Sequence, residues 1–213
     1  MKKFVLFISN SHIAAISRSI REGLVFVDFP IQRLAFIEPE AVASLKCEEG
    51  FLSSDSDATA EAIRRITKGD SKLNLQQFSQ IIVYGCDLAC RGGGANWILK
   101  LEQSAKGYSA AARHASYVDS IRLSQHYRFL CRIQDDDIRR KILSVPSPFP
   151  SEVHPWRQRI KTLNLQRIKQ FVQMIGQEIN ALSVRYMPIP IELLTPGATE
   201  QCRSSGKKAG DCF

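Results

Sequence analysis

The chain opens with a short apolar run that gives way to helical spacing. Phe4 to Ser9 is rich in residues that favour strands, which predicts a β-strand. From Ile13 onward the apolar residues recur at helical intervals until Gly23, which predicts a helix that begins a few residues after the strand. This order of strand, tight turn and helix is the first half of a crossover unit.

Further apolar runs predict the remaining strands. Ile81 to Tyr84 and Ile142 to Val145 are compact runs that suit strands covered on both faces, and Val184 to Met187 predicts a last strand. Leu24 to Phe29 and Leu34 to Ile37 are alternatives for the second strand of the chain. We expect one of these two to be an edge strand or a loop, because a proline separates them.

Helical spacing recurs between these runs. It predicts helices over Ala58 to Thr67, over residues 110–133 and over a long amphipathic stretch from residue 160 to about residue 183. Residues 53–57 are expected to form a polar loop before the first of these helices, and residues 135–137 to be solvated or to cap a helix. The alternation predicts an α/β fold, a three-layer sandwich with a mostly parallel sheet. At 213 residues the chain is interpreted as a single domain, residues 1–213.

Composition and charge narrow the class of protein. Apolar residues make up 44% and charged residues 23% of the chain, which excludes collagen-like, coiled-coil and disordered proteins. The net charge of +8 comes without an aromatic and basic recognition motif, so we do not expect nucleic acid as a partner. No apolar run has membrane-spanning length, and the run after Lys3 is too short for a secretory signal. We therefore expect a cytoplasmic protein that does not contact membranes.

The cysteines give no sign of a metal site. The six cysteines form no Cys-x-x-Cys pair and no zinc-like grouping with the four histidines. Reduced thiols are the expected state. Cys86 with Cys90, or Cys202 with Cys212, remain alternatives for pairing under oxidation.

The segment Ser9-Asn10-Ser11-His12 is the first candidate for chemistry, because it joins the first predicted strand to the first predicted helix. In parallel sheets, functional groups gather in loops beyond the carboxyl ends of the strands. A serine there lies beside a helix N-terminus, whose free N–H groups and dipole stabilise a developing oxyanion. Ser11 is therefore a candidate nucleophile, and the alternative is that it only caps the helix.

The same segment resembles the first sequence block of the SGNH/GDSL hydrolase family. The resemblance implies a flavodoxin-like α/β fold with Ser11 as the nucleophile. The sequence departs from the family at Ser9, where the family has glycine, and at Asn10, where it has aspartate. His12 is expected to pack locally or to contact substrate rather than to act as the base.

A second match lies in Gly210-Asp211-Cys212-Phe213, where the family has an Asp-x-x-His block. Asp211 matches the aspartate that orients the catalytic histidine, and the histidine itself is expected directly after Phe213. We expect the natural chain to be longer than the one given; the alternative is a protein that lacks the base. Without a base the serine hydroxyl is a poor nucleophile, so a chain ending at Phe213 is expected to be nearly inactive. His154 is a weaker candidate for the base.

The family's third block, Gly-x-Asn-Asp, matches less well. Gly85 fits its glycine, and Asp87 stands where the family has the asparagine that donates to the oxyanion. An ionised carboxylate has no proton to donate, so Asp87 is protonated, or binds substrate, or leaves the oxyanion to backbone donors. Those donors would be the N–H of Ser11 and a group in the loop that starts at Gly92, a loop also interpreted as a hinge. Gly50 is a possible match for the glycine of the second block.

The resemblance implies a serine esterase that needs no cofactor and acts on a small-molecule or glycan ester. An acylated carbohydrate or polysaccharide is the expected substrate class. The alternative is a non-catalytic module that binds an anionic glycan or nucleotide in the same cleft. Tyr84, Trp97 and Trp156 are candidates to stack against a sugar ring or to pack in the core. The sequence makes no prediction of the oligomeric state.

Overall fold

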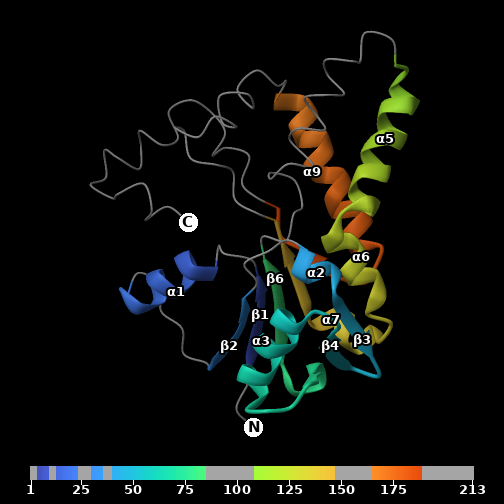
Figure 1. The fold of residues 1–213 in the computed structure, drawn as a ribbon. Helices are drawn as coiled ribbons and strands as arrows, with labels where there is room; N and C mark the ends of the chain where they lie inside the picture. Colours follow the sequence, from blue (N-terminus) through green and yellow to red (C-terminus); the bar gives the residue numbers. More distant parts are fainter. Residues whose placement is uncertain are drawn as a thin grey trace.

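The fold is built around one parallel β-sheet (Figure 1). The computed structural model describes residues 4–9, 13–23, 30–35, 40–84, 108–146 and 165–188. The strands of the main sheet are β1 (Val5–Ser9), β2 (Ile31–Ala35), β6 (Gln80–Tyr84), β7 (Ile142–Val145) and β8 (Arg185–Tyr186). They lie in the order β2-β1-β6-β7-β8, and each neighbouring pair is parallel. Counted along the chain this order is 2-1-3-4-5, the order of flavodoxin-like sheets. The predicted α/β fold with a mostly parallel sheet is confirmed.

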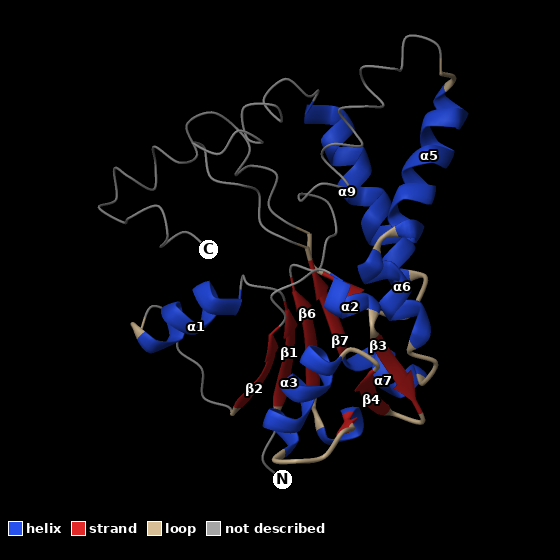
Figure 2. Cartoon of the chain, viewed as in Figure 1, coloured by secondary structure: helices blue, strands red, loops and turns tan. Residues whose placement is uncertain are grey.

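Helices flank the main sheet, an arrangement compatible with a three-layer sandwich (Figure 2). They are α1 (Ile13–Arg21), α2 (Glu40–Ala43), α3 (Asp57–Thr67), α5 (Ala110–Leu123), α6 (Gln125–Arg132), α7 (Asp136–Lys141) and α9 (Leu165–Asn180). Crossovers between parallel strands are right-handed, so the helix between β1 and β2 lies on the opposite face from the helices that follow β6 and β7. Among the described helices, none has the length and apolar composition needed to cross a bilayer.

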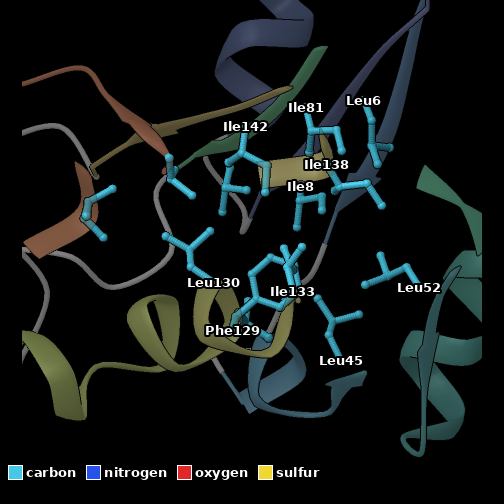
Figure 3. Close-up of a cluster of buried hydrophobic side chains, with 14 of the residues drawn as sticks. Leu6, Ile8, Leu45, Leu52, Ile81, Phe129, Leu130, Ile133, Ile138 and Ile142 are labelled. Atoms are coloured by element: carbon cyan, nitrogen blue, oxygen red, sulfur yellow. The ribbon is translucent and has the colours of Figure 1, made fainter. Parts of the chain in front are cut away.

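One face of the main sheet carries the hydrophobic core. The strand register aligns Ile8 of β1 with Leu34 of β2 and with Val83 of β6. Residues aligned in neighbouring parallel strands point to the same face, and these three are completely buried. Phe129 of α6 and Ile138 of α7 cover this face (Figure 3). Burial alternates along β6 and β7 between this core face and the opposite, less buried face.

The predicted helix over residues 110–133 is in fact two helices, α5 and α6, separated by Ser124. The backbone of Ser124 is extended, with φ −63° and ψ 145°. Its N–H donates to the carbonyl of Ile121 at 3.1 Å, and its Oγ accepts from the N–H of Tyr127 at 3.2 Å. One serine therefore ends the first helix and caps the second. The apolar spacing continues across this break, which is why periodicity alone missed it.

A second, antiparallel sheet, absent from the sequence prediction, is made of β3 (Leu45–Glu48), β4 (Phe51–Ser54) and β5 (Leu73–Asn74). The expectation that residues 53–57 form a polar loop was wrong at its start, since residues 53 and 54 end β4. Glu49 and Gly50 form the two-residue turn between β3 and β4, with φ of 50° and 81°. Positive φ at both positions is the signature of a type I′ hairpin turn.

Arg132, the last residue of α6, closes part of the outer edge of the second sheet. β3 is the edge strand of that sheet. The Nη1 group of Arg132 donates to the carbonyl of Ala43 at 2.6 Å and to that of Leu45 at 3.0 Å. These bonds attach α6 to the small sheet.

The remaining predicted boundaries vary in accuracy. β7 has the predicted bounds, whereas β8 is limited to Arg185–Tyr186. The second strand is β2, an edge strand that overlaps the predicted run Leu34 to Ile37, and Leu24 to Phe29 lies outside the described residues. The long amphipathic helix is α9, which ends at Asn180.

Candidate functional site

The carboxyl ends of β1 and β6 meet where the strand order reverses direction. The first crossover leads from β1 to β2 on one side, and the later strands continue from β6 on the other. Ser9, the last residue of β1, is aligned with Tyr84, the last residue of β6. In open α/β sheets this switch point is the place where ligands bind. The chain thus leaves the sheet at two adjacent positions of this edge.

The predicted site residues continue the chain from these two positions. Asn10 follows Ser9 directly, and Gly85 follows Tyr84 directly. The predicted residues themselves lie outside the described part of the chain: Asn10, Ser11, His12, Gly85, Asp87, Gly92 and Asp211. The same holds for His154, Trp97 and Trp156.

Ser9 and Tyr84 are both shielded from solvent at this edge, and the N-terminus of α1 follows it. Ser9 is fully buried, and its side chain points to the opposite face from that of Ile8. Tyr84 is half-buried, and burial raises the pKa of its phenol. The helix α1 begins at Ile13, four positions after Ser9, so its N-terminus follows this edge of the sheet closely along the chain. The positive end of the helix dipole favours negative charge within the first turn.

A histidine and a serine form a buried pair that the sequence analysis missed. The Nε2 atom of His126 lies 2.9 Å from the Oγ of Ser144, and both side chains are completely buried. A serine beside an imidazole has the geometry of an activated nucleophile. Because neither group reaches the surface, we assign the pair a structural role that joins α6 to β7. A serine inside the apolar run Ile142 to Val145 was the available signal, since a buried hydroxyl needs a partner.

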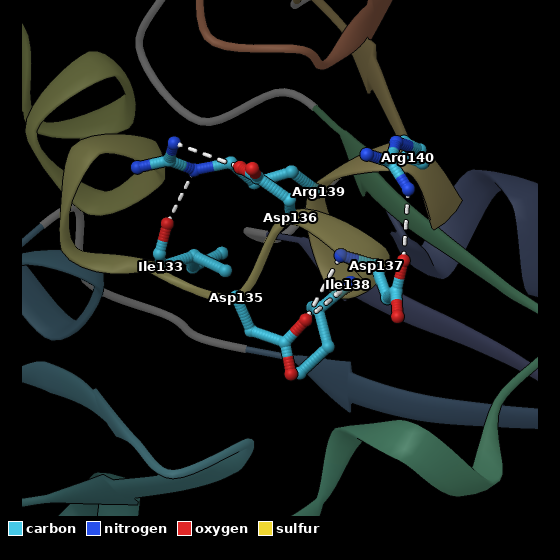
Figure 4. Close-up of polar contacts among 7 residues, drawn as sticks. All are labelled: Ile133, Asp135, Asp136, Asp137, Ile138, Arg139 and Arg140. Atoms are coloured by element: carbon cyan, nitrogen blue, oxygen red, sulfur yellow. Dashed lines mark hydrogen bonds and ion pairs between the residues drawn. The ribbon is translucent and has the colours of Figure 1, made fainter.

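The acidic run at residues 135–137 caps a helix, one of the two predicted roles. The Oδ1 atom of Asp135 accepts from the N–H groups of Asp137 at 2.9 Å and Ile138 at 3.1 Å (Figure 4). The hydrogen bond from the Ile138 N–H lowers the pKa of Asp135 most. Desolvation raises this pKa in part, and the bond from the Asp137 N–H lowers it further, so that the net shift is downward. Asp137 and Arg140 form an exposed ion pair at 2.9 Å on the same helix.

A cavity of about 690 Å³ lies between the β3–β4 hairpin and the start of α7. Its lining residues are Cys47, Glu48, Glu49, Gly50, Phe51, Lys72, Gln134 and Asp135. Gly50, the possible match for the family's second glycine, is therefore a hairpin residue rather than a residue at the end of a main-sheet strand. Gly50 has a φ of 81°, which side chains with a Cβ atom rarely adopt, so glycine suits the turn.

Cys131 is expected to react with iodoacetamide faster than Cys47 at neutral pH. Both are free thiols, but Cys131 is exposed and Cys47 is partly buried. Burial first, and then the charges of Asp135 and Glu48, raises the pKa of Cys47 to about 11. Only the thiolate reacts, so the rate at Cys47 should keep rising with pH toward that value. Timed alkylation followed by peptide mass spectrometry measures both rates, and equal rates at neutral pH would contradict this expectation.

The described side chains contain no metal centre. Within the described ranges, no three histidine, cysteine, aspartate or glutamate side chains gather in a way that could hold a metal ion. The two cysteine pairs proposed from the sequence, Cys86 with Cys90 and Cys202 with Cys212, lie outside those ranges. Comparisons with protein-family models, with characterised proteins and with solved structures gave no match to this chain.

Proposed function

We propose that this protein is a serine hydrolase of the SGNH type that cleaves acyl esters, with Ser11 as its nucleophile. The observation that carries the proposal is the alignment of Ser9 with Tyr84 at the switch point of a sheet ordered 2-1-3-4-5. The segment with Ser11 and the segment with Gly85 and Asp87 begin one residue beyond these two positions. Two of the three segments that resemble the family therefore start from adjacent points of one edge.

In the proposed reaction, the Oγ of Ser11 attacks the ester carbonyl carbon while a histidine takes its proton. The tetrahedral intermediate collapses, and the alcohol leaves with the proton that the imidazole returns. Water, activated by the same imidazole, then releases the acid from the acyl-enzyme. Asp211 holds the imidazole in the productive tautomer and stabilises its charged form.

The oxyanion of the intermediate needs hydrogen-bond donors. The backbone N–H of Ser11 and the N-terminus of α1 would supply positive electrostatic potential, and the loop at Gly92 is the proposed second donor. Asp87 has no proton to donate when ionised, so we assign it to substrate binding together with His12 and Asn10. An acylated carbohydrate is the proposed substrate class, which rests on the resemblance stated above.

A fluorophosphonate probe, which reacts with activated serines, tests the proposal. The protein for this test carries a histidine directly after Phe213, where the resemblance expects the base. We expect labelling that Ser11→Ala abolishes and that Ser17→Ala, a control on α1, leaves unchanged. Absence of labelling in a protein with native circular dichroism would contradict the proposal. Salt-sensitive retention of that unlabelled protein on a polyanion column would then support the alternative, a binding module.

A further inference from the structure

The exposed side of α9 carries an unbroken row of carboxamide side chains. These residues, called the amide ladder below, are Gln166, Gln170, Gln173, Gln177 and Asn180, and each is exposed. They follow one another at intervals of four, three, four and three residues. At 100° per residue these five positions fall within a sector of about 80° of the helix surface.

The opposite side of α9 is fixed in the protein interior. Phe171, Ile175 and Ile179 are buried in the core, and the ring of Phe171 meets the ring of Tyr117 of α5 at a centroid distance of 5.4 Å. Glu178 accepts from the guanidinium of Arg122, which also belongs to α5, at 2.8 Å. The helix is therefore held in one rotational setting, with the amide ladder turned outward.

The chemistry of the amide ladder is unusual for the surface of this chain. Charged residues form 23% of the sequence, yet the sector of the ladder holds none, and Lys169 lies at its border. A carboxamide group has one acceptor oxygen and two N–H donors, and Gln166 already interacts with another group of the protein. This combination matches sugar hydroxyl groups, which also donate and accept, and it gives no advantage to an ionic ligand.

The spacing of the ladder suits a linear polymer. A helix rises 1.5 Å per residue, so the ladder advances by about 5.3 Å per step and spans about 21 Å in all. One step is close to the length of one pyranose unit in an extended polysaccharide. The N-terminal part of α9 projects past the carboxyl ends of the main-sheet strands (Figure 1). The ladder therefore runs toward the edge from which the Ser11 segment departs.

We propose that the amide ladder of α9 is a docking track for an extended, neutral polysaccharide chain, whose acyl groups are the substrate of the proposed site. The statement that the bound polysaccharide is a substrate rests on the proposed function. The binding of the polysaccharide to α9 does not depend on it and can be measured without catalysis.

Native affinity electrophoresis of the full chain in gels that contain hydroxyethyl cellulose tests the proposal. We expect the polysaccharide to slow the protein. The triple variant Gln170→Ala, Gln173→Ala and Gln177→Ala should weaken binding at least about tenfold, equivalent to about 1.4 kcal/mol. Alanine favours helices at least as well as glutamine, so α9 should remain folded in this variant, which circular dichroism can verify.

The control variant Gln77→Ala with Gln134→Ala removes exposed carboxamides elsewhere and should bind like the parent protein. Soluble starch, whose chains coil, should retard the parent less than the extended polymer does. Equal retardation of parent and triple variant would overturn the proposal, as would retardation only by dextran sulfate. Loss of a dimer in the triple variant, seen by light scattering, would also overturn it by assigning the ladder to self-association. Polysaccharide binding by a protein that the fluorophosphonate probe does not label would contradict the proposed hydrolase function. It would still support the amide ladder as a polysaccharide-binding surface.

Discussion

Ester hydrolysis is expected to fall at least about a thousandfold when Ser11 is replaced by alanine in the protein that carries a histidine directly after Phe213. The reason is that alanine has no oxygen to form the acyl-enzyme, and only the binding and oxyanion groups remain to accelerate the reaction. Turnover of a p-nitrophenyl ester measures the change. The fluorophosphonate probe measures only the covalent labelling of the serine, whereas the ester assay measures both acylation and release of the acid. The two readouts are therefore independent.

The control for this expectation is Ser17→Ala on the same helix, which should keep the rate of the parent protein. Circular dichroism and urea unfolding establish that both variants fold. A Ser11→Ala protein that hydrolyses the ester within tenfold of the parent would show that another group performs the reaction, and the assignment of Ser11 would then be wrong.

Phe129→Ala is expected to lower the free energy of unfolding by about 3–5 kcal/mol. The ring of Phe129 is completely buried and is among the largest fully buried side chains of the described residues. It extends from α6 into the space between the main sheet and β3, beside Ile133 and Leu45 (Figure 3). Truncation removes apolar contacts and leaves a cavity that the surrounding strands can fill only in part.

Urea unfolding measures this loss through the midpoint and the slope of the transition. The matched control is Leu123→Ala, which removes a large apolar side chain that is 62% exposed at the end of the neighbouring helix α5. Its effect should stay within about 0.5 kcal/mol of zero. A loss below about 1 kcal/mol for Phe129→Ala would mean that α6 is not essential to the core.

β1, β6 and β7 were predictable because these strands are short and nearly continuous in apolar residues. Ile142 to Val145 shows this best, since the prediction and β7 coincide. The small antiparallel sheet was missed because only Leu45 and Leu52 in β3 and β4 are fully buried, and the other positions look like a polar loop. Two buried positions on separate strands give too little periodicity to identify a hairpin without its turn, Glu49-Gly50.

The edge that carries the candidate site was predictable, and the contacts within the site were not. The fold rule for parallel sheets selects the loops at the carboxyl ends of the strands, those after β1 and β6 among them, before any coordinates are known. The register that aligns Ser9 with Tyr84 depends on packing between strands distant in sequence, which no local pattern records. The pairing of His126 with Ser144 shows the same limit, because each residue lies in an ordinary amphipathic or apolar run.

The bonds from Arg132 bear on how the protein avoids joining other chains. An outermost strand exposes main-chain groups that can recruit a strand from a neighbouring molecule and begin a shared sheet. In β3 the guanidinium occupies the Leu45 carbonyl and adds a positive charge beside it. A foreign strand approaching from that direction would have to displace a charged partner first. The bonds from Arg132 thus oppose aggregation by strand addition at β3.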